Sequence, residues 1–218
     1  MPVKEATMLQ LERIRVQHDG NPILRDVDLS VAKGEKIWIH GPSGSGKTTL
    51  LKVLFCAEYF EGRLLHENRP VTPPELTHYR SHLGFVSQRI PDFDLTVGEV
   101  LRYPLQFRAN RHRSFPQDRA MELLAQLHFK QDVLSRRFPS LSGGEKQRLM
   151  VLLLLLVNRP VFLLDEVTAA LDPENIENVV RLLTASPGRT VISVSHNRDW
   201  ETFSTRSLFM QSGSLQAE

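Results

Sequence analysis

Apolar and polar residues alternate along the first part of the chain in a pattern typical of β-strands. Residues 9–16 and 27–31 both alternate, which predicts two strands that each bury one face. Four almost wholly apolar runs predict buried strands, and a shorter strand is expected in a fifth segment. The five segments are 36–40, 83–88, 161–166, 190–194 and 61–65. Helices are expected at 49–55, from Pro73 onward and at 173–185, so we predict an antiparallel β layer followed by an α/β part.

The middle of the chain differs, because its apolar residues recur with helical spacing. Thr96 can cap a helix that extends to Leu105, and a second amphipathic run begins at Ala120. No segment there has a convincing strand pattern, so we expect an inserted helical lobe. The predicted fold class is α/β, with a parallel-sheet core, the antiparallel layer and the lobe in one domain. The expected boundaries are 1–218 for the domain, 8–90 and 158–218 for the core, and about 91–157 for the lobe.

Composition excludes several classes of protein. The 218 residues include 27 Lys and Arg against 25 Asp and Glu, without the basic block expected of a nucleic-acid-binding protein. The single cysteine, Cys56, rules out an internal disulfide framework and fits a reducing compartment. The longest apolar run, 149–157, is too short to cross a bilayer, which takes about 20 residues in a helix. We therefore expect no membrane span and no nucleic-acid partner.

A glycine-rich loop provides the first candidate site. Residues 41–48 have the form G-x-x-x-x-G-K-[ST] and lie between a predicted strand and a predicted helix. The glycines let backbone N–H groups face a phosphate chain, Lys47 adds a positive charge, and Thr48 can place its hydroxyl on a magnesium ion. A chance match is the alternative, but the flanking elements favour a nucleotide site. The expected phosphate contacts are Gly41, Pro42, Ser43, Gly44, Ser45, Gly46, Lys47, Thr48 and Thr49.

Four polar residues follow the ends of predicted strands. Because ligands of open parallel sheets bind outside the carboxyl ends of the strands, we expect these residues near Lys47. Asp165 can reach magnesium, Glu166 can orient or deprotonate an attacking water, and His196 can contact a terminal phosphate. Gln88 can reach metal or water, although each of the four is unremarkable in isolation. The candidate catalytic residues are Glu166, His196, Lys47 and Gln88, and the candidate metal ligands are Thr48, Gln88 and Asp165.

A second helix end in the chain can also bind an anion. Ser142 can cap a helix that begins with Gly143 and Gly144, and Glu145 is placed to complete a capping box. The two glycines leave backbone N–H groups accessible at this end. A plain nucleotide kinase or GTPase needs one such site, so the second requires another explanation.

Together these segments resemble the ATP-binding subunit of an ABC transporter. Residues 41–48 resemble its Walker A motif, and 161–166 resemble Walker B with its catalytic glutamate. Residues 141–147 resemble the family signature LSGGQ, with Glu145 in the last place. The Q-loop glutamine, the D-loop and the switch histidine are matched by Gln88, 170–172 and His196. The resemblance implies an ABC-type P-loop ATPase with a RecA-like core.

The same resemblance implies how the site is assembled. Two copies, expected to be identical, would pair head to tail with two ATP molecules between them. Each ATP would lie between the phosphate loop of one chain and Ser142, Gly143 and Gly144 of the other. Glu166 would act as the base, with Lys47 and Mg²⁺ balancing the developing charge. The pair would drive separate permease chains from the cytoplasmic face of a bacterial inner membrane.

Details of the chain refine this resemblance. Residues 96–101 and 165–172 look most like the small ATP-binding subunit of a bacterial iron-export ABC transporter, which implies iron as the cargo. An aromatic residue usually stacks on adenine near the end of the first strand. Val16 occupies that place in our alignment, so we expect apolar contact from Val16 and stacking from nearby His18. A common arginine in the helix after the signature is replaced by Leu153.

Two other functions compete with this one. A soluble ATP-driven clamp acting on DNA or ribosomes uses the same kind of head, but such proteins usually carry a long coiled-coil insertion or a second head. This chain has one phosphate loop and no heptad run. A P-loop kinase or GTPase would leave 141–148 unexplained, and no Asn-Lys-x-Asp segment occurs.

Overall fold

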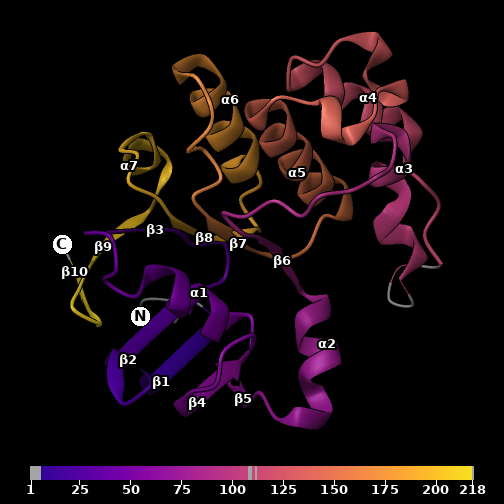
Figure 1. The fold of residues 1–218 in the computed structure, drawn as a ribbon. Helices are drawn as coiled ribbons and strands as arrows, with labels where there is room; N and C mark the ends of the chain where they lie inside the picture. Colours follow the sequence, from indigo (N-terminus) through magenta and orange to yellow (C-terminus); the bar gives the residue numbers. More distant parts are fainter. Residues whose placement is uncertain (1–5, 108–109, 111, 218) are drawn as a thin grey trace.

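The computed structural model describes residues 6–107, 110 and 112–217, and two sheets form the framework of this part of the chain (Figure 1). The larger sheet has six strands in the order β10-β9-β3-β8-β7-β6. All neighbouring strands in it are parallel except β10, which is antiparallel to β9. The bounds are β3 Lys36–His40, β6 Leu83–Val86, β7 Val161–Asp165, β8 Thr190–Val194, β9 Arg206–Gln211 and β10 Ser214–Ala217.

The smaller sheet is the predicted antiparallel layer. Its order is β2-β1-β4-β5, with bounds β1 Thr7–His18, β2 Asn21–Ala32, β4 Glu61–His66 and β5 Arg69–Pro70. Leu11 lies opposite Leu29, and Ile14 lies opposite Val27, so the buried side chains of the two long strands meet on one face. The pairing shifts register several times, including between Val16 and Gln17.

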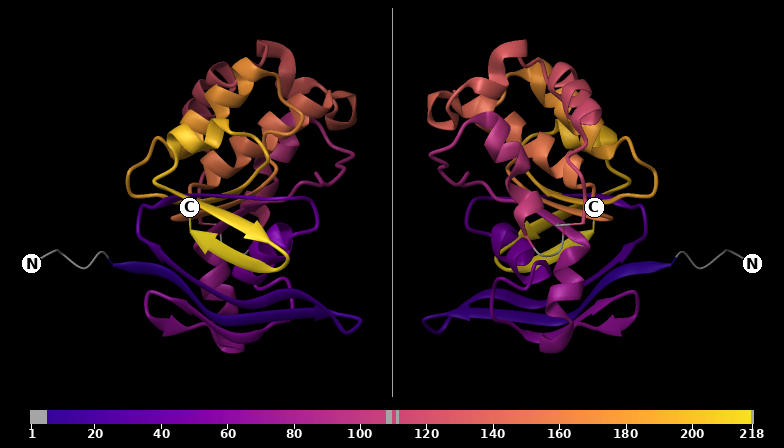
Figure 2. Two further views of the ribbon diagram at one scale, coloured as in Figure 1. Left: turned by 90° about the vertical axis from the view of Figure 1, so that its left-hand side faces the viewer. Right: turned by 90° about the vertical axis from the view of Figure 1, so that its right-hand side faces the viewer.

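Helices cover both faces of the larger sheet. Helix α1 (Lys47–Leu54) lies between the two sheets and contacts β2, β7 and β8 (Figures 1 and 2). Helices α5 (Gly143–Val157), α6 (Pro173–Thr184) and α7 (Asp199–Phe203) lie on the opposite face. Side chains of β7 alternate between two apolar clusters, because successive residues of a strand point to opposite faces.

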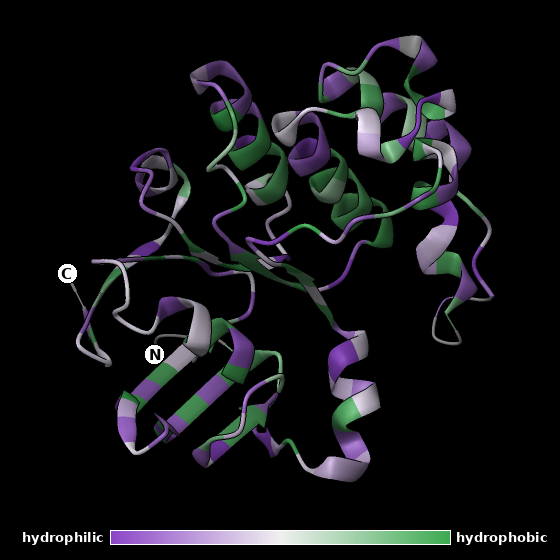
Figure 3. Cartoon of the chain, in the orientation of Figure 1, coloured by the Kyte–Doolittle hydropathy of each residue, from purple (hydrophilic) through white to green (hydrophobic). Residues whose placement is uncertain are grey.

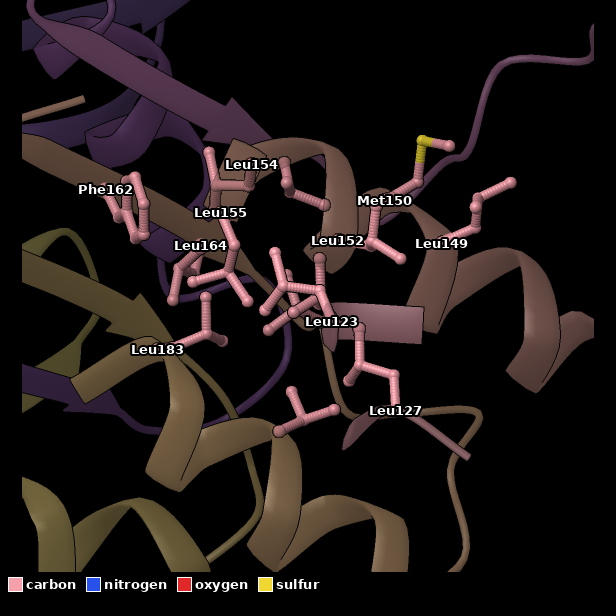
Figure 4. Packing of buried hydrophobic residues seen from close by; sticks show 14 of the residues in the cluster. Leu123, Leu127, Leu149, Met150, Leu152, Leu154, Leu155, Phe162, Leu164 and Leu183 are labelled. Carbon is pink, nitrogen blue, oxygen red and sulfur yellow. The ribbon is translucent and has the colours of Figure 1, made fainter. Parts of the chain in front are cut away.

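The apolar run at 149–157 is explained by the position of α5. This helix contacts α4, α6 and β6, and beyond its first turns it is apolar along its whole length (Figure 3). Leu154 and Leu155 lie beside Phe162 and Leu164 of β7 (Figure 4). Burial of each such side chain contributes about 1.5–3 kcal/mol. Most of the run is therefore buried in the domain and does not cross a membrane, as its length predicts.

The described residues between β6 and β7 form helices and loops and contain no strand. After α2 (Leu76–Ser81), which precedes β6, come α3 (Val97–Arg102), α4 (Gln117–Gln126) and α5. Thr96 and Glu99 form the capping box of α3. Short 3-10 turns lie at Tyr103–Gln106, Gln131–Ser135 and Phe138–Ser140, and another, Pro73–Glu75, precedes α2. A lobe of about 91–157, between core parts 8–90 and 158–218, remains our proposal.

The strand predictions hold at the seven expected places, and the ends differ by a few residues. Four elements were not predicted: β5, α7, β9 and β10. Residues 1–5, 108–109, 111 and 218 of the expected domain lie outside the described part. None of the described helices combines the length and the apolar character needed to cross a membrane.

Candidate functional site

A cavity of about 800 Å³ lies at the carboxyl ends of β3, β7 and β8, where the sequence predicts a site. Most of the predicted residues line it. These are His18, Ser43, Gly44, Gly46, Lys47, Thr48, Thr49, Gln88, Glu166 and His196. Ligands of parallel sheets bind at this edge, because the loops after the strands converge there. The structure thus brings together residues that are up to 178 positions apart in the chain, from His18 to His196.

Two glycines allow the loop after β3 to fold back on the end of the sheet. Gly41 has φ +140°, and a Cβ there would overlap the carbonyl group of Met210 on β9. Gly46 has φ +107° and precedes α1 without a side-chain cap. L-residues with side chains rarely adopt these conformations. The loop therefore presents backbone N–H groups and the N-terminus of α1 to the cavity, which suits an anion.

Lys47 is held inside this loop. Its Nζ donates to the carbonyl oxygens of Gly41 and Pro42, each at 2.9 Å. The residue is 6% exposed, and burial lowers the pKa of its ammonium group, although Glu166 and Asp165 act in the opposite direction. The ammonium group is oriented by neutral carbonyl oxygens and carries no short ion pair in the described structure. It can therefore turn to a phosphate without breaking a salt bridge.

Thr48 lines the cavity, and its hydroxyl group is paired with the carboxylate of Asp165, which does not line it. The Thr48 hydroxyl donates to Oδ1 of Asp165 at 3.0 Å, and Asp165 is 2% exposed. Burial raises the pKa of Asp165, whereas hydrogen bonds from Thr48 and the Gln88 backbone oppose the rise. Hydroxyl and carboxylate oxygens fit Mg²⁺, which commonly takes one or two protein oxygens and completes its shell with phosphates and water. No group of three or more His, Cys, Asp or Glu residues in the described part forms another candidate metal centre.

Glu166 stands where β7 ends and the chain turns. Its backbone has φ +52°, in the left-handed region, and its side chain is 12% exposed. Nε2 of His196 lies 3.5 Å from Oε1 of Glu166. Burial raises the pKa of the Glu166 carboxyl group, and the contacts with His196 and Lys47 act against this rise. A carboxylate with a raised pKa beside a phosphate-binding loop is suited to accept a proton.

The base contact expected from Val16 is wrong. Val16 is 2% exposed and belongs to the apolar cluster under β1, so its side chain cannot reach the cavity. The register shift between Val16 and Gln17 breaks the alternation of the strand. His18, the last residue of β1, lines the cavity instead, with Nε2 3.3 Å from Glu58. Stacking of a base on His18 stays a prediction.

The second predicted anion site lies outside this cavity. Ser142 caps α5 by accepting from the Glu145 N–H, and the Glu145 carboxylate accepts from the Ser142 N–H at 2.8 Å. Arg136 donates to Glu145 at 2.7 Å. Burial opposes ionisation, but the Ser142 N–H and Arg136 hold the pKa of Glu145 below its ordinary value. Ser142, Gly143 and Gly144 are absent from the lining of the cavity, so one chain does not bring its two anion sites together.

Sequence reasoning missed Gln147, which connects these two parts of the molecule. Its side-chain amide joins α5 to the backbone after β7. The residue is 4% exposed, and a polar residue at a buried helix position requires a partner. The sequence shows that Gln147 lies within the signature segment, but it does not show which backbone groups its side chain contacts.

Comparisons with known proteins agree with this geometry. The family model described as "ABC transporter" matches residues 24–169. The energy-coupling factor transporter ATP-binding protein EcfA1 of Staphylococcus aureus (strain MSSA476) is 30% identical over 93% of this chain and 77% of its own length. The uncharacterized ABC transporter ATP-binding protein MJ0796 of Methanocaldococcus jannaschii is 32% identical over 89% of this chain and 88% of its own length.

Solved structures show the same fold. A dimeric post-hydrolysis state of the MJ0796 cassette, bound to ADP and Pi, has a TM-score of 0.82 and 28% identity, over 96% of this chain and 98% of that one. A bacterial Atm1-family ABC exporter with ATP bound has a TM-score of 0.85 and 27% identity, over 99% of this chain and 39% of that one. The fold predicted from the sequence is confirmed. The chain belongs to the ABC transporter family as an ATP-binding domain, and it is an ATPase.

Proposed function

We propose that this chain is the ATP-hydrolysing subunit of a transporter and acts with separate permease chains at the cytoplasmic face of a bacterial inner membrane. The observation that carries the proposal is the separation of the two anion sites. The phosphate loop faces the cavity, whereas the signature turn at Ser142 lies outside it. A second copy arranged head to tail would place its signature turn over each phosphate loop. The dimeric MJ0796 cassettes support such a pair.

Hydrolysis in this proposal is a transfer of the γ-phosphoryl group of ATP to water. The water oxygen bonds to the γ-phosphorus, the bond to the bridging oxygen breaks, and ADP and phosphate leave. Glu166 accepts the proton of the water, and His196 contacts the γ-phosphate. Lys47 and the loop N–H groups hold the phosphates. Mg²⁺, held by Thr48, Asp165 and Gln88, would supply positive charge to the phosphate oxygens.

The acidic limb of turnover follows from the raised pKa of Glu166. The base works only when ionised, so the rate is lost as pH falls through its pKa, and this loss occurs above the ordinary value of 4.5. We expect kcat/KM for ATP, which reports the ionisation of the free enzyme, to decline at a pH clearly above 4.5, with the fold intact. Phosphate release measured against MgATP concentration at each pH, together with MgATP affinity, separates turnover from binding. A kcat/KM that stays constant down to pH 4.5 would contradict the assignment.

A surface groove gives a place for the permease. The groove, of about 810 Å³, runs between the core and the helical region and is lined mainly by apolar side chains, including Phe85, Met150 and Leu154. Phe107 stands at its edge with 53% of its surface exposed. An aromatic side chain left in water beside an apolar groove is typical of a protein contact surface. We propose that an apolar cytoplasmic segment of the permease binds there.

The transport role is tested by the distribution of the chain in its own cells. We expect the chain to sediment with membranes, and we expect Phe107→Glu to move at least half of it to the soluble fraction. Tyr59→Glu is the matched control, because Tyr59 is 84% exposed and lies outside the groove. Purified Phe107→Glu should keep wild-type ATP affinity. A wild-type chain found only in the soluble fraction would favour the ATP-driven clamp.

Iron as the cargo stays a prediction without support from the comparisons. The relatives named above are an energy-coupling factor protein and an uncharacterized transporter protein. The site described above would bind ATP, so its residues do not identify the transported substrate.

A further inference from the structure

Gln147 joins the signature helix to the backbone of Glu166. Its Nε2 donates to the carbonyl oxygen of Glu166 at 2.8 Å, and its Oε1 accepts from the Ala170 N–H at 3.1 Å. A carbonyl can only accept and an amide N–H can only donate, so the two partners fix the orientation of the Gln147 amide. With 4% of its surface exposed, the side chain has no access to bulk water as a substitute partner.

The residue that Gln147 holds has an unusual backbone. Glu166 has φ +52°, a conformation that costs a residue with a side chain about 1–2 kcal/mol. Its N–H donates to the Val194 carbonyl on β8 at 2.9 Å, and its carbonyl also accepts from Ala169 at 3.2 Å. Gln147 adds a contact from α5, on the other side of the turn. The backbone of Glu166 is therefore fixed between β8 and α5.

The same helix begins with the signature turn. Gly144 approaches the D-loop so closely that a Cβ there would lie 3.0 Å from the Ala170 carbonyl oxygen. Gln147 lies less than one turn after Gly144, and its Oε1 accepts from the N–H of Ala170. A shift of the signature turn relative to β7 would thus move the Gln147 amide, and with it the Glu166 carbonyl.

We propose that Gln147 is a positioning residue, which holds the Glu166 backbone so that the carboxylate points into the cavity and couples its position to the signature turn. The inference rests on the proposed role of Glu166 as the base. The alternative is a purely structural role, in which Gln147 only satisfies its own buried polar atoms. If Gln147 is a positioning residue, a variant that folds normally but lacks the hydrogen bond to Glu166 has a lower turnover. If its role is purely structural, such a variant keeps the wild-type turnover.

Two substitutions separate these roles. Gln147→Met keeps the shape of the side chain and removes both hydrogen bonds. We expect kcat to fall about tenfold, in the range of a small misplacement of a reacting group, and KM for ATP to change less than twofold. Gln147→Glu keeps an acceptor for Ala170. When ionised it sets a carboxylate oxygen against the Glu166 carbonyl, and when protonated it can donate to that carbonyl. Its kcat relative to Gln147→Met should therefore rise as pH falls.

The ionisable side chains that act on Glu166 are Lys47, Asp165 and His196, and both variants leave them unchanged. Thr190→Val is the control for structure alone, because Thr190 is fully buried and accepts from the Gly34 N–H at 2.9 Å, far from the cavity. It should lower the melting temperature and leave kcat unchanged. Glu166→Gln is measured in parallel.

The results test the base role of Glu166 separately from the positioning role of Gln147. An active Glu166→Gln would overturn the proposed base and the role of Gln147 with it. An inactive Glu166→Gln with wild-type kcat in Gln147→Met would overturn only the positioning role. A third outcome is a low kcat in Gln147→Met and a constant ratio between the kcat values of Gln147→Glu and Gln147→Met at every pH. This outcome would also overturn the positioning role, because the rate would then not depend on the hydrogen bond to the Glu166 carbonyl. The result we expect is that the kcat of Gln147→Glu rises relative to that of Gln147→Met as pH falls.

Discussion

Glu166→Gln is expected to lower the ATP turnover of this chain by about a hundred- to ten-thousandfold, the usual contribution of a general base. Glutamine keeps the size of the side chain and its contact distance to His196, but it cannot accept the proton of the attacking water. ATP affinity should change little, because Lys47 and the loop N–H groups are untouched. The variant should therefore accumulate with bound ATP.

Phosphate release and ATP binding measure the two parts of this expectation. Glu177→Gln is a suitable control, since Glu177 is an exposed carboxylate on α6 outside the cavity. Light scattering on Glu166→Gln with MgATP should show a dimer where the nucleotide-free protein is a monomer. Unchanged turnover would remove Glu166 from the mechanism. Bound ATP without a dimer would count against closure of the head-to-tail pair by these chains alone.

Lys47→Ala is expected to weaken ATP binding by about ten- to a hundredfold. A hydrogen bond to a charged group contributes about 1.5–3 kcal/mol, and each 1.4 kcal/mol is a factor of ten in affinity. The ammonium group of Lys47 already lies within the loop, where Gly41 and Pro42 orient it. Its loss removes the full positive charge of the phosphate site and leaves only the partial charges of the backbone.

Titration calorimetry with ATP measures this loss. Lys52→Ala provides the comparison, because Lys52 is an exposed cation of the same helix that does not line the cavity. It should keep the wild-type affinity. A Lys47→Ala protein that unfolds at the wild-type temperature and binds ATP as tightly as the wild type would show that the phosphates bind elsewhere.

Periodicity predicts the strands that carry the site, because these strands are either wholly buried or buried on one face. Strands β3 and β8 have the predicted bounds. The same reasoning misses α7, a helix of five residues, and the β9–β10 hairpin, whose short strands mix polar and apolar residues. Such elements are set by contacts with β3 and β2 that are remote in sequence.

The sequence also predicts which candidate residues lie at the ends of the strands. A strand of a parallel sheet delivers its next residue to a known edge, so Glu166 and His196 can be placed before the structure is known. Local irregularities cannot be placed in this way. After the register shift that follows Val16, His18 lines the cavity while Val16 is buried, and no pattern in residues 9–18 reveals this. The contact of Gln147 with Glu166 depends on how α5 packs against the turn after β7, and this packing cannot be predicted from the sequence of α5.

The strand order has a consequence for synthesis of the chain on the ribosome. Strand β3, which precedes the phosphate loop, pairs only with β8 and β9, and these are made more than 150 residues later. Gly41 also approaches Met210 of β9. A nascent chain can form the β1–β2 hairpin early, but the strand before its phosphate loop has no paired neighbours until β8 and β9 have been made. The conformation of the phosphate loop therefore depends on segments that leave the ribosome long after the loop itself.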